Sequence, residues 1–319
     1  MKPMKCFVTG GAGFIGSHLA DRLIIEKNYV TVFDNLSVGK IEFIKQNTDN
    51  ANFKFIQGDL LDLDLVKKAI KGHDLIFHLA ANPEARLGIE NTELDLKQET
   101  IVTYNVLEAM RVNNISRIVF SSSGTVYGKV PFIPIKENYG PLLPVSLYGA
   151  GKLAGEGLIS AFCGTFEMQA WIYRFANIIG PRMTHGVIRD FIEKLKINCS
   201  ILEILGDGEQ SKPYLCVKDC VDGILFGLEN AHESINVFNL GCASTTTVNA
   251  IAQILVEEMG LKDVVFKYTG GDRGWPGDVP RFKCDVEKIT KLGWKAKYTS
   301  DEAVRIAIKG ILGKKFGGL

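Results

Sequence analysis

A tyrosine and a lysine stand four residues apart at Tyr148 and Lys152. On a helix this spacing places both side chains on one face, so the ammonium can approach the phenol. A free phenol has a pKa of about 10, and a nearby cation favours the phenolate and lowers that value. The pair therefore predicts a tyrosine that accepts a proton.

The same spacing occurs a second time, at Tyr214 and Lys218, and position along the chain distinguishes the two pairs. Tyr148 follows a predicted strand that ends in the three serines of 121–123. The carboxyl ends of parallel strands form the ligand-binding edge of such a sheet, so a serine hydroxyl and the phenol can converge there. We therefore assign the chemistry to Tyr148 and Lys152.

A glycine-rich turn, residues 9–18, reads TGGAGFIGSH and joins the first predicted strand to the first predicted helix. Gly10 allows the sharp turn, and Gly13 lets the backbone approach a pyrophosphate without an intervening Cβ. Gly16 lets the helix pack closely on the strand. Free N–H groups at the helix start then face the anion, so the turn predicts a dinucleotide cradle.

Asp34 ends the second predicted strand, where a carboxylate can accept both hydroxyls of an adenosine ribose. Asn35 follows it, so no adjacent cation offsets the repulsion between Asp34 and a 2′-phosphate. These residues favour NAD over NADP. Asp59, after the third strand, is placed to reach the adenine amino group, although an isolated Gly-Asp is more often a turn or helix cap.

The elements that must position these groups alternate short apolar runs with helical patterns, which is typical of βαβ units. We predict an α/β fold: a Rossmann-type doubly wound parallel sheet with a smaller C-terminal α/β substrate domain. Residues 1–175 form the cofactor domain and 176–319 the substrate domain, with part of 211–245 returning to the first. The predicted strands are 6–9, 29–33, 53–57, 75–79, 117–122 and 169–174, and the predicted helices are 14–27, 63–71, 94–113, 147–162 and 187–197.

Composition excludes several classes for this chain of 319 residues. Lys and Arg number 37 against 36 Asp and Glu, so the net charge of +1 gives no field that attracts nucleic acid or an anionic membrane. No apolar run reaches the roughly 18 residues of a membrane span. Seven scattered cysteines without CxxC, and histidines without ligand spacing, favour reduced thiols and no metal site. The start, from Met1, lacks the pattern of a signal peptide, so we expect a cytoplasmic protein.

Four features stand in order along the chain: the glycine turn with Asp34, the sequence HLAA at 78–81, SSSGTVYG at 121–128, and the Tyr148–Lys152 pair. In these the chain resembles the extended short-chain dehydrogenase/reductases. Within them it looks most like the NAD-dependent UDP-glucose 4-epimerases and related nucleotide-sugar epimerases. The resemblance runs from Val8 to about Trp294 and implies a homodimer formed through helices such as 94–113 and 147–162.

The resemblance implies roles for single residues. Tyr148 becomes the catalytic base, Lys152 lowers its pKa and holds the nicotinamide ribose, and Ser123 bonds the sugar hydroxyl. The cofactor-binding positions marked by the motifs and the resemblance are Gly10, Gly13, Phe14, Ile15, Gly16, Asp34, Asn35, Ser37, Gly39, Asp59, Leu60, Leu79, Ala80, Ala81, Asn82, Ser121, Tyr148, Lys152 and Phe175.

The resemblance also places the substrate. Asn177 takes the position that binds its diphosphate, and Val187 begins the stretch that packs on uracil. The remaining matched positions, after two turn-rich segments, are Lys212, Tyr214, Arg273 and Asp278.

Three departures from the family pattern stand out. Lys212 replaces a common arginine, which reduces a bidentate phosphate contact to a point charge. Residues 275–276 intrude between Arg273 and Asp278. Glu99 stands where the family usually has asparagine, and the sequence alone offers no physical account of it.

The implied activity is interconversion of UDP-hexoses at C4 through a 4-keto sugar. Related dehydratases carry an Asp-Glu pair in the segment 123–125, and related decarboxylases carry Glu at the position of Thr125, because their chemistry needs those acids. Neither acid is present, which favours an epimerase, while a dehydratase, decarboxylase or reductase stays the alternative. A non-catalytic regulator that senses NAD is a further alternative, but such proteins typically lose the Tyr and Lys that this chain keeps. The sugar stays open among glucose, N-acetylglucosamine and a uronic acid.

Overall fold

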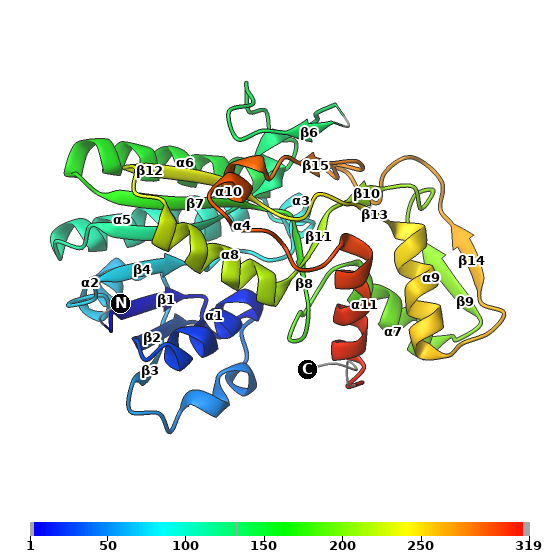
Figure 1. Cartoon of the computed structure of the whole chain (residues 1–319), viewed down its shortest axis with the longest axis horizontal. Helices are drawn as coiled ribbons and strands as arrows, with labels where there is room; N and C mark the ends of the chain where they lie inside the picture. Colours follow the sequence, from blue (N-terminus) through cyan, green and yellow to red (C-terminus); the bar gives the residue numbers. More distant parts are fainter. Residues whose placement is uncertain (1–2, 132, 315–319) are drawn as a thin grey trace.

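The computed structural model describes residues 3–131 and 133–314, and its largest element is a parallel sheet of seven strands (Figure 1). The strand order is β12-β7-β5-β4-β1-β2-β3. The chain adds β2 and β3 on one side of β1 and the later strands on the other side, so the order of strands across the sheet reverses between β1 and β4. This is the doubly wound arrangement predicted from the sequence. The strands are β1 (Lys5–Thr9), β2 (Tyr29–Asp34), β3 (Phe53–Gln57), β4 (Leu75–His78), β5 (Arg117–Ser123), β7 (Gln169–Phe175) and β12 (Ile235–Leu240).

Helices cover both faces of this sheet. Successive residues of β1 show the division, since Phe7 belongs to one buried cluster and Val8 to another. Because side chains alternate between faces along a strand, a sheet buried on both sides needs continuous apolar runs. Helices α1 (Phe14–Ile25) and α8 (Val217–Asn230) pack on one face. The other face carries α2 (Leu63–Ala69), α5 (Val102–Val112) and α6 (Leu147–Phe166).

The prediction of one regular α-helix over 94–113 is wrong, because the stretch is helical but not α-helical throughout. The structure divides this stretch into α4 (Thr92–Asp95), a π-helical segment η3 (Leu96–Ile101) and α5, after a short α3 (Leu87–Glu90). The Thr103 hydroxyl donates to the Glu99 carbonyl oxygen at 2.5 Å, so a side chain competes with the backbone ladder at this point. A π turn shifts the faces of the residues it contains, and such turns often mark functional sites.

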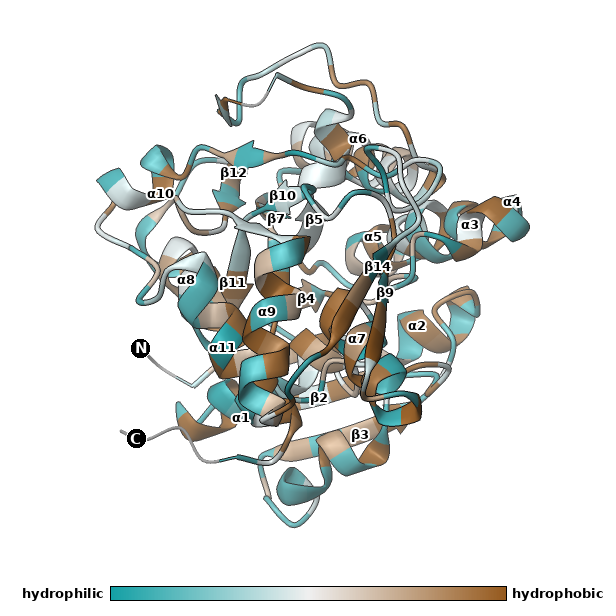
Figure 2. Ribbon diagram, turned by 90° about the vertical axis from the view of Figure 1, so that its right-hand side faces the viewer, coloured by the Kyte–Doolittle hydropathy of each residue, from teal (hydrophilic) through white to brown (hydrophobic). Residues whose placement is uncertain are grey.

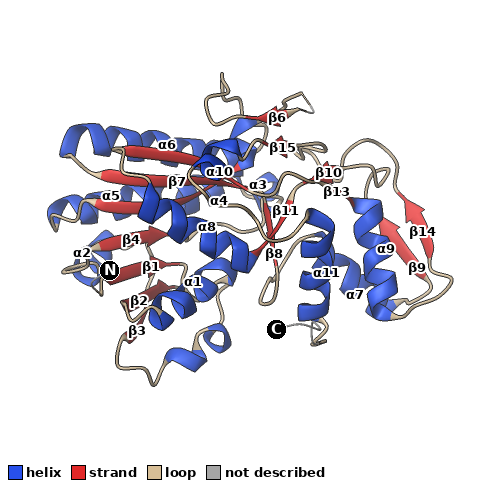
Figure 3. Cartoon of the chain, in the orientation of Figure 1, coloured by secondary structure: helices blue, strands red, loops and turns tan. Residues whose placement is uncertain are grey.

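The C-terminal region carries two-stranded sheets and its own buried cluster (Figure 3). Its helices are α7 (Val187–Ile197), α9 (Val248–Met259), α10 (Glu287–Lys291) and α11 (Ser300–Ile311). The short strands are β6 (Pro134–Ile135), β8 (Asn177–Ile179), β9 (Ile201–Ile204), β10 (Ser211–Lys212), β11 (Tyr214–Cys216), β13 (Thr246–Thr247), β14 (Val265–Tyr268) and β15 (Lys283–Cys284). The 3-10 turns of the described residues are η1 (Ile41–Phe43), η2 (Lys45–Asn47) and η4 (Gly124–Tyr127).

The chain crosses between its two regions more than once. After β7 the chain leaves the main sheet, and β8 pairs with β11 in a separate sheet. The chain then returns when β12 pairs in parallel with β7 and α8 packs against α1. In the described part of the chain, no helix has the length and apolarity to span a membrane. Met1 and Lys2, which bear on the expectation about a leader segment, lie outside the described residues.

Candidate active site

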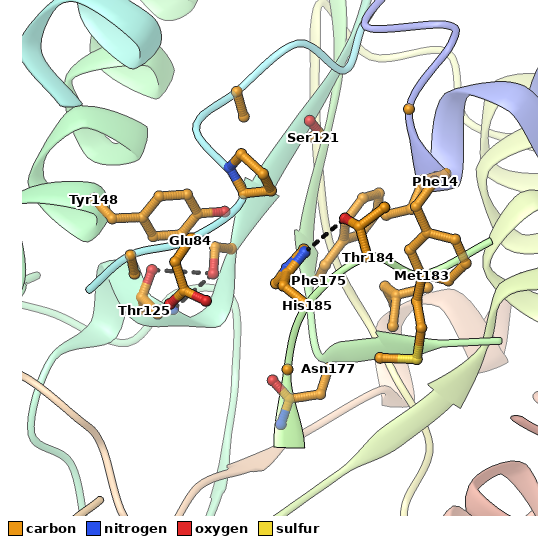
Figure 4. A pocket seen from close by; sticks show the side chains of 18 of the residues that line it. Phe14, Glu84, Ser121, Thr125, Tyr148, Phe175, Asn177, Met183, Thr184 and His185 are labelled. Carbon is orange, nitrogen blue, oxygen red and sulfur yellow. Dashed lines mark hydrogen bonds between the residues drawn. The ribbon is translucent and has the colours of Figure 1, made fainter. Parts of the chain in front are cut away.

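One cavity of about 570 Å³ extends from the glycine turn across the carboxyl ends of the strands to the C-terminal region. Its walls come from the turns that follow β1 and β4 and from β5 and α6 on one side, and from β8, α7 and β10 on the other. Figure 4 shows Tyr148 reaching into it from one wall, with His185, Phe175 and Asn177 on the opposite wall. The cavity therefore joins the predicted cofactor and substrate residues.

The turn between β1 and α1 is built from backbone. Gly10 has a φ of +65°, and a Cβ there would lie 2.8 Å from the Ala80 nitrogen. A Cβ at Gly16 would collide with the Gly10 carbonyl. Gly13 caps α1 without any side-chain hydrogen bond, and the first turn of the helix carries no acid. This leaves unscreened amide groups facing the cavity, which is the surface that a pyrophosphate requires.

Asp34 is held rigidly at the end of β2. Its carboxylate accepts the Ala12 amide at 3.0 Å and the Leu36 amide at 2.8 Å. Burial raises the pKa of Asp34, and the two amide contacts oppose that rise. Asn35 donates to Asp59 at 3.2 Å, which ties together the two acids predicted to face the adenosine. A Cβ at Gly39 would lie 2.8 Å from the Asp34 carboxylate, so the loop closes tightly over it.

Most of the residues predicted for this site line the cavity. Among the described residues, the cavity lining includes all of the predicted catalytic and cofactor positions except Asn82. It also includes all of the predicted substrate positions except Arg273. Asn82 is buried and acts behind the wall, where its side chain donates to Asp95 at 2.9 Å. Arg273 pairs with its neighbour Asp272 at 3.7 Å.

The predicted reactive pair lies at the start of α6. The Ser146 hydroxyl caps this helix by accepting the Gly149 amide at 3.1 Å, which fixes the turn that carries Tyr148. The Lys152 ammonium lies 5.7 Å from the centroid of the Tyr148 ring. Burial raises the pKa of Tyr148, and the charge of Glu99 adds to that rise. The other Tyr-Lys pair is divided between elements, since Tyr214 lies in β11 and Lys218 in α8.

Lys152 forms a fully buried ion pair with Glu99. The ammonium lies 2.9 Å from the Glu99 carboxylate, and each side chain is 1% exposed. Burial raises the pKa of Glu99 to about 7, although Lys152 and the Asn82 amide both oppose the rise. The residue that departs from the family pattern therefore lies directly against the predicted catalytic lysine.

A second lysine pair lies at the substrate end. The Lys212 ammonium is 2.6 Å from the Asp278 carboxylate, which also accepts the Gly274 amide at 3.2 Å. Asn177 begins β8 and Val187 begins α7, and both line the same end of the cavity. The two segments joined by this pair lie far apart in the sequence, so neither spacing nor pattern predicts the contact.

The sequence reasoning missed three charged residues of the cavity, Glu84, Arg86 and Asp190, and the first two lie side by side. Glu84 and Arg86 line the wall after β4 and form a two-bond pair, with distances of 2.9 and 3.1 Å. Burial raises the pKa of Glu84, but Arg86 outweighs this and the net shift is downward. Their place after the carboxyl end of a central strand is the signal that could have found them. Thr184 and His185 line the opposite wall.

The donor set fits a dinucleotide better than a metal. Backbone amides at the glycine turn suit phosphates, and the Asp34 carboxylate suits ribose hydroxyls, so the residues present can hold NAD. Among the described residues no group of three His, Cys, Asp or Glu side chains could hold a metal ion.

Comparison with known proteins gives concordant matches. The model of the NAD dependent epimerase/dehydratase family matches residues 6–241. A provisionally assigned UDP-glucose 4-epimerase of Methanocaldococcus jannaschii is 35% identical over 305 residues, which are 93% of this chain and 95% of that protein. A solved UDP-galactose 4-epimerase has 38% identity and a TM-score of 0.86, and the match covers 96% of this chain and 98% of that chain. The UDP-glucose 4-epimerase of Thermotoga maritima, solved with UDP-glucose, has 32% identity, a TM-score of 0.86 and coverage of 96% and 98%.

Proposed function

Because the chain belongs to the NAD-dependent epimerase/dehydratase family, and is thus an enzyme with NAD as its cofactor, we propose that it is an isomerase that interconverts UDP-hexoses at C4. The UDP-glucose/UDP-galactose pair is the favoured substrate. The observation that carries the proposal is the meeting of Ser123, Tyr148 and Lys152 in one cavity with the glycine turn. A hydroxyl, a phenol and an ammonium beside a nicotinamide suffice to move one hydride and one proton.

Each of these groups has one task in the proposed reaction. Bound NAD supplies a transient acceptor for the hydride from sugar C4. Tyr148 takes the proton of the 4-hydroxyl and later returns it. Lys152 steadies the negative phenolate, and Ser123 hydrogen-bonds the sugar oxygen. Because the proton and the hydride both return to the same sugar, no second substrate is consumed.

The substrate end holds the nucleotide while the sugar turns. In this proposal Asn177 and Lys212 contact the diphosphate, Val187 packs on the base, and Asp278 serves the ribose. Lys212 is partly exposed in its ion pair, so its ammonium can also serve an anion. The 4-keto sugar rotates about the diphosphate linkage and presents its other face. Retention of the nucleotide end makes return of the hydride to that face productive.

The acids near the sugar support an epimerase over a dehydratase or decarboxylase. Thr125 stands where a decarboxylase would have an acid, and its hydroxyl donates to Ser123 at 3.0 Å. Glu84 is the carboxylate on the adjacent wall, and its pairing with Arg86 favours the ionised form. Elimination of water needs a proton donor as well as a base, and a carboxylate held ionised is a poor donor.

We also propose a homodimer and a division into cofactor and substrate domains. Several exposed apolar side chains lie on the elements from α3 to α6, and Figure 2 shows hydrophobic colour along the ribbons of α3 and α4 at the edge of the molecule. They are Leu87, Ile89, Leu96, Ile101, Tyr104, Val112, Leu147 and Phe166. A patch of this kind marks an interaction surface.

The proposed domain division follows the two ends of the cavity. Residues 1–175 with the returning β12 serve the cofactor, and 176–319 serve the substrate. The free cysteines suit a cytoplasmic setting, and galactose metabolism is the proposed role.

The test is to incubate the purified protein with a panel of UDP-sugars that includes UDP-hexoses and a UDP-hexuronic acid, without added cofactor, and to identify products by chromatography. We expect UDP-glucose and UDP-galactose to interconvert with no net change in redox state. The matched control is Tyr148→Phe, which should retain NAD and lose turnover. Release of water or carbon dioxide, or an absolute need for external reductant, would overturn the proposal in favour of the related enzyme classes.

A further inference from the structure

Glu99 forms an ion pair with Lys152 directly behind the reactive end of the cavity. Lys152 and Tyr148 line the cavity, whereas Glu99 is 1% exposed and lies behind its wall. A buried ion pair is sustained only where the remaining polar atoms are also bonded. The second oxygen of the Glu99 carboxylate accepts the Asn82 amide at 2.9 Å, so both oxygens are engaged.

The packing around the pair leaves room for a glutamate and little more. A Cβ at Gly151 would lie 2.6 Å from the Glu99 Cβ and 3.0 Å from its Cγ. Glu99 can therefore approach Lys152 only because the residue before Lys152 lacks a side chain. Glu99 itself belongs to the π-helical segment η3, which packs against α6. A glycine of α6 and the π turn of η3 thus meet at this carboxylate.

The charges around the pair come from three elements. Asp95 on α4 is 1% exposed and one of its oxygens accepts the Asn82 side chain, Tyr148 lies on α6, and His78 lies on β4. Burial, with a smaller contribution from Lys152, lowers the pKa of His78 to about 3, so this imidazole is neutral. Burial raises the pKa of Asp95. When Glu99 is ionised, its negative charge offsets the ammonium charge that Tyr148 experiences.

With the proposed function as its premise, we propose that Glu99 is a positioning residue that acts through Lys152. It fixes the ammonium beside Tyr148 and weakens the field by which that ammonium favours the phenolate. The acidity of the Tyr148 phenol is then set by the Glu99–Lys152 pair and not by Lys152 alone. This gives the Glu99 departure a physical account.

The test compares the NAD-bound wild-type enzyme with Glu99→Gln and Glu99→Asn. The near-ultraviolet absorbance of tyrosinate is recorded against pH, and the matching Tyr148→Phe protein is subtracted in each case so that the signal belongs to Tyr148. Loss of the carboxylate charge should lower the midpoint by about one pH unit or more, since a neighbouring charge shifts a pKa by roughly 1–3 units. The rising limb of kcat/KM against pH should move by the same amount.

Conservative variants separate positioning from simple support of the fold. Glu99→Asp keeps the charge, so its midpoint should stay near that of the wild type. Gly151→Ala keeps both charges but crowds Glu99, and its midpoint should move toward that of Glu99→Gln. The matched control is Gly157→Ala on the same helix, where a Cβ meets nothing within 4 Å and the midpoint should not move.

An unchanged midpoint in both Glu99→Gln and Glu99→Asn overturns the inference, whatever the stability of the variants. If Glu99→Gln does not fold, Glu99→Asn decides, because asparagine is the residue usual in the family. Failure of the proposed function is a separate outcome. A wild-type enzyme that converts no UDP-hexose would end the proposal of epimerase activity, while the absorbance titration would still report whether Glu99 controls Tyr148.

Discussion

The two lysine–carboxylate pairs at this cavity differ in their exposure. Lys152 and Glu99 lie 2.9 Å apart with each side chain 1% exposed. Lys212 and Asp278 lie 2.6 Å apart with exposures of 25% and 7%. Separating the two charges of a buried ion pair costs much free energy because water cannot replace the lost partner, whereas the cost is small for a partly exposed pair. The first pair therefore belongs to the fixed framework of the site, and the second is available to an arriving anion.

The surroundings of the two carboxylates match this difference. The second oxygen of Glu99 accepts the Asn82 amide, and the wall at Gly151 leaves no space beside it. Asp278 has an amide from Gly274, but a Cβ at Gly274 would lie an ordinary 3.5 Å from its carboxylate. One pair is tightly enclosed and the other has room to move.

Breaking the buried pair should have the largest effect. Lys152→Met leaves Glu99 without its cation, so we expect the free energy of unfolding to fall by about 3–5 kcal/mol. Turnover should fall by roughly 10²–10⁴-fold because Tyr148 loses its neighbouring charge. Urea unfolding and steady-state kinetics measure both. The double variant Lys152→Met/Glu99→Gln should recover most of the stability and none of the turnover, and a double variant as unstable as the single one would argue against the pairing.

Breaking the partly exposed pair should act on binding. Lys212→Met removes one charge-assisted contact, and such contacts contribute about 1.5–3 kcal/mol, so KM for the UDP-sugar should rise roughly tenfold or more. The value of kcat should stay within about twofold, because in the proposed function this lysine binds the diphosphate and takes no part in the proton or hydride transfer. Initial rates over a range of substrate concentrations separate the two constants. A fall in kcat at constant KM would show that this pair, too, belongs to the reaction.

The pH dependence of stability sharpens the comparison. Burial raises the pKa of Glu99 from 4.5 to about 7, so between these values the folded protein holds this proton more tightly than the unfolded chain does. The contribution of Glu99 to stability is then full below that window and is lost as the pH rises through it. The free energy of unfolding of the wild type minus that of Glu99→Gln should fall as the pH rises from about 4.5 to 8. Urea unfolding at several pH values tests this, and a difference independent of pH contradicts it.

The sequence predicted those features of the fold and site that depend on residues close together in the chain. The glycine turn, the apolar strands and the α6 pair are short-range features, and the doubly wound sheet with its NAD cofactor is confirmed. The range 94–113 has a continuous helical period, so nothing in its apolar spacing signals the π turn, beside which the Thr103 hydroxyl donates to the Glu99 carbonyl oxygen. Apolar periodicity reports which face is buried, and it does not report how a backbone ladder is closed.

Contacts between side chains that lie far apart in the sequence could not be predicted. Spacing alone could not separate the pair at Tyr148 from the pair at Tyr214. The position of Tyr148 after the strand with serines 121–123 separated them, and in the structure the second pair is divided between β11 and α8. Asp278 was predicted as a substrate residue, and its pairing with Lys212 depends on a loop and strand β10, which meet only in the folded chain. Glu99 was visible as a departure, but its meaning depends on Lys152 approaching it from α6.

The smallest effect compares two glycines that each lie beside one of these carboxylates. Gly151→Ala gains about 1 kcal/mol of helix propensity but forces a methyl against Glu99, and overpacking of this kind costs about 1–3 kcal/mol. We expect a net loss of about 1 kcal/mol by urea unfolding. Gly274→Ala keeps the amide that Asp278 accepts and meets the carboxylate at 3.5 Å, so its effect should stay within about 0.5 kcal/mol. Equal losses of stability at the two positions would mean that the buried pair is no more tightly enclosed than the partly exposed pair. The distinction between a fixed lysine and an available one would then rest only on the exposure of the side chains.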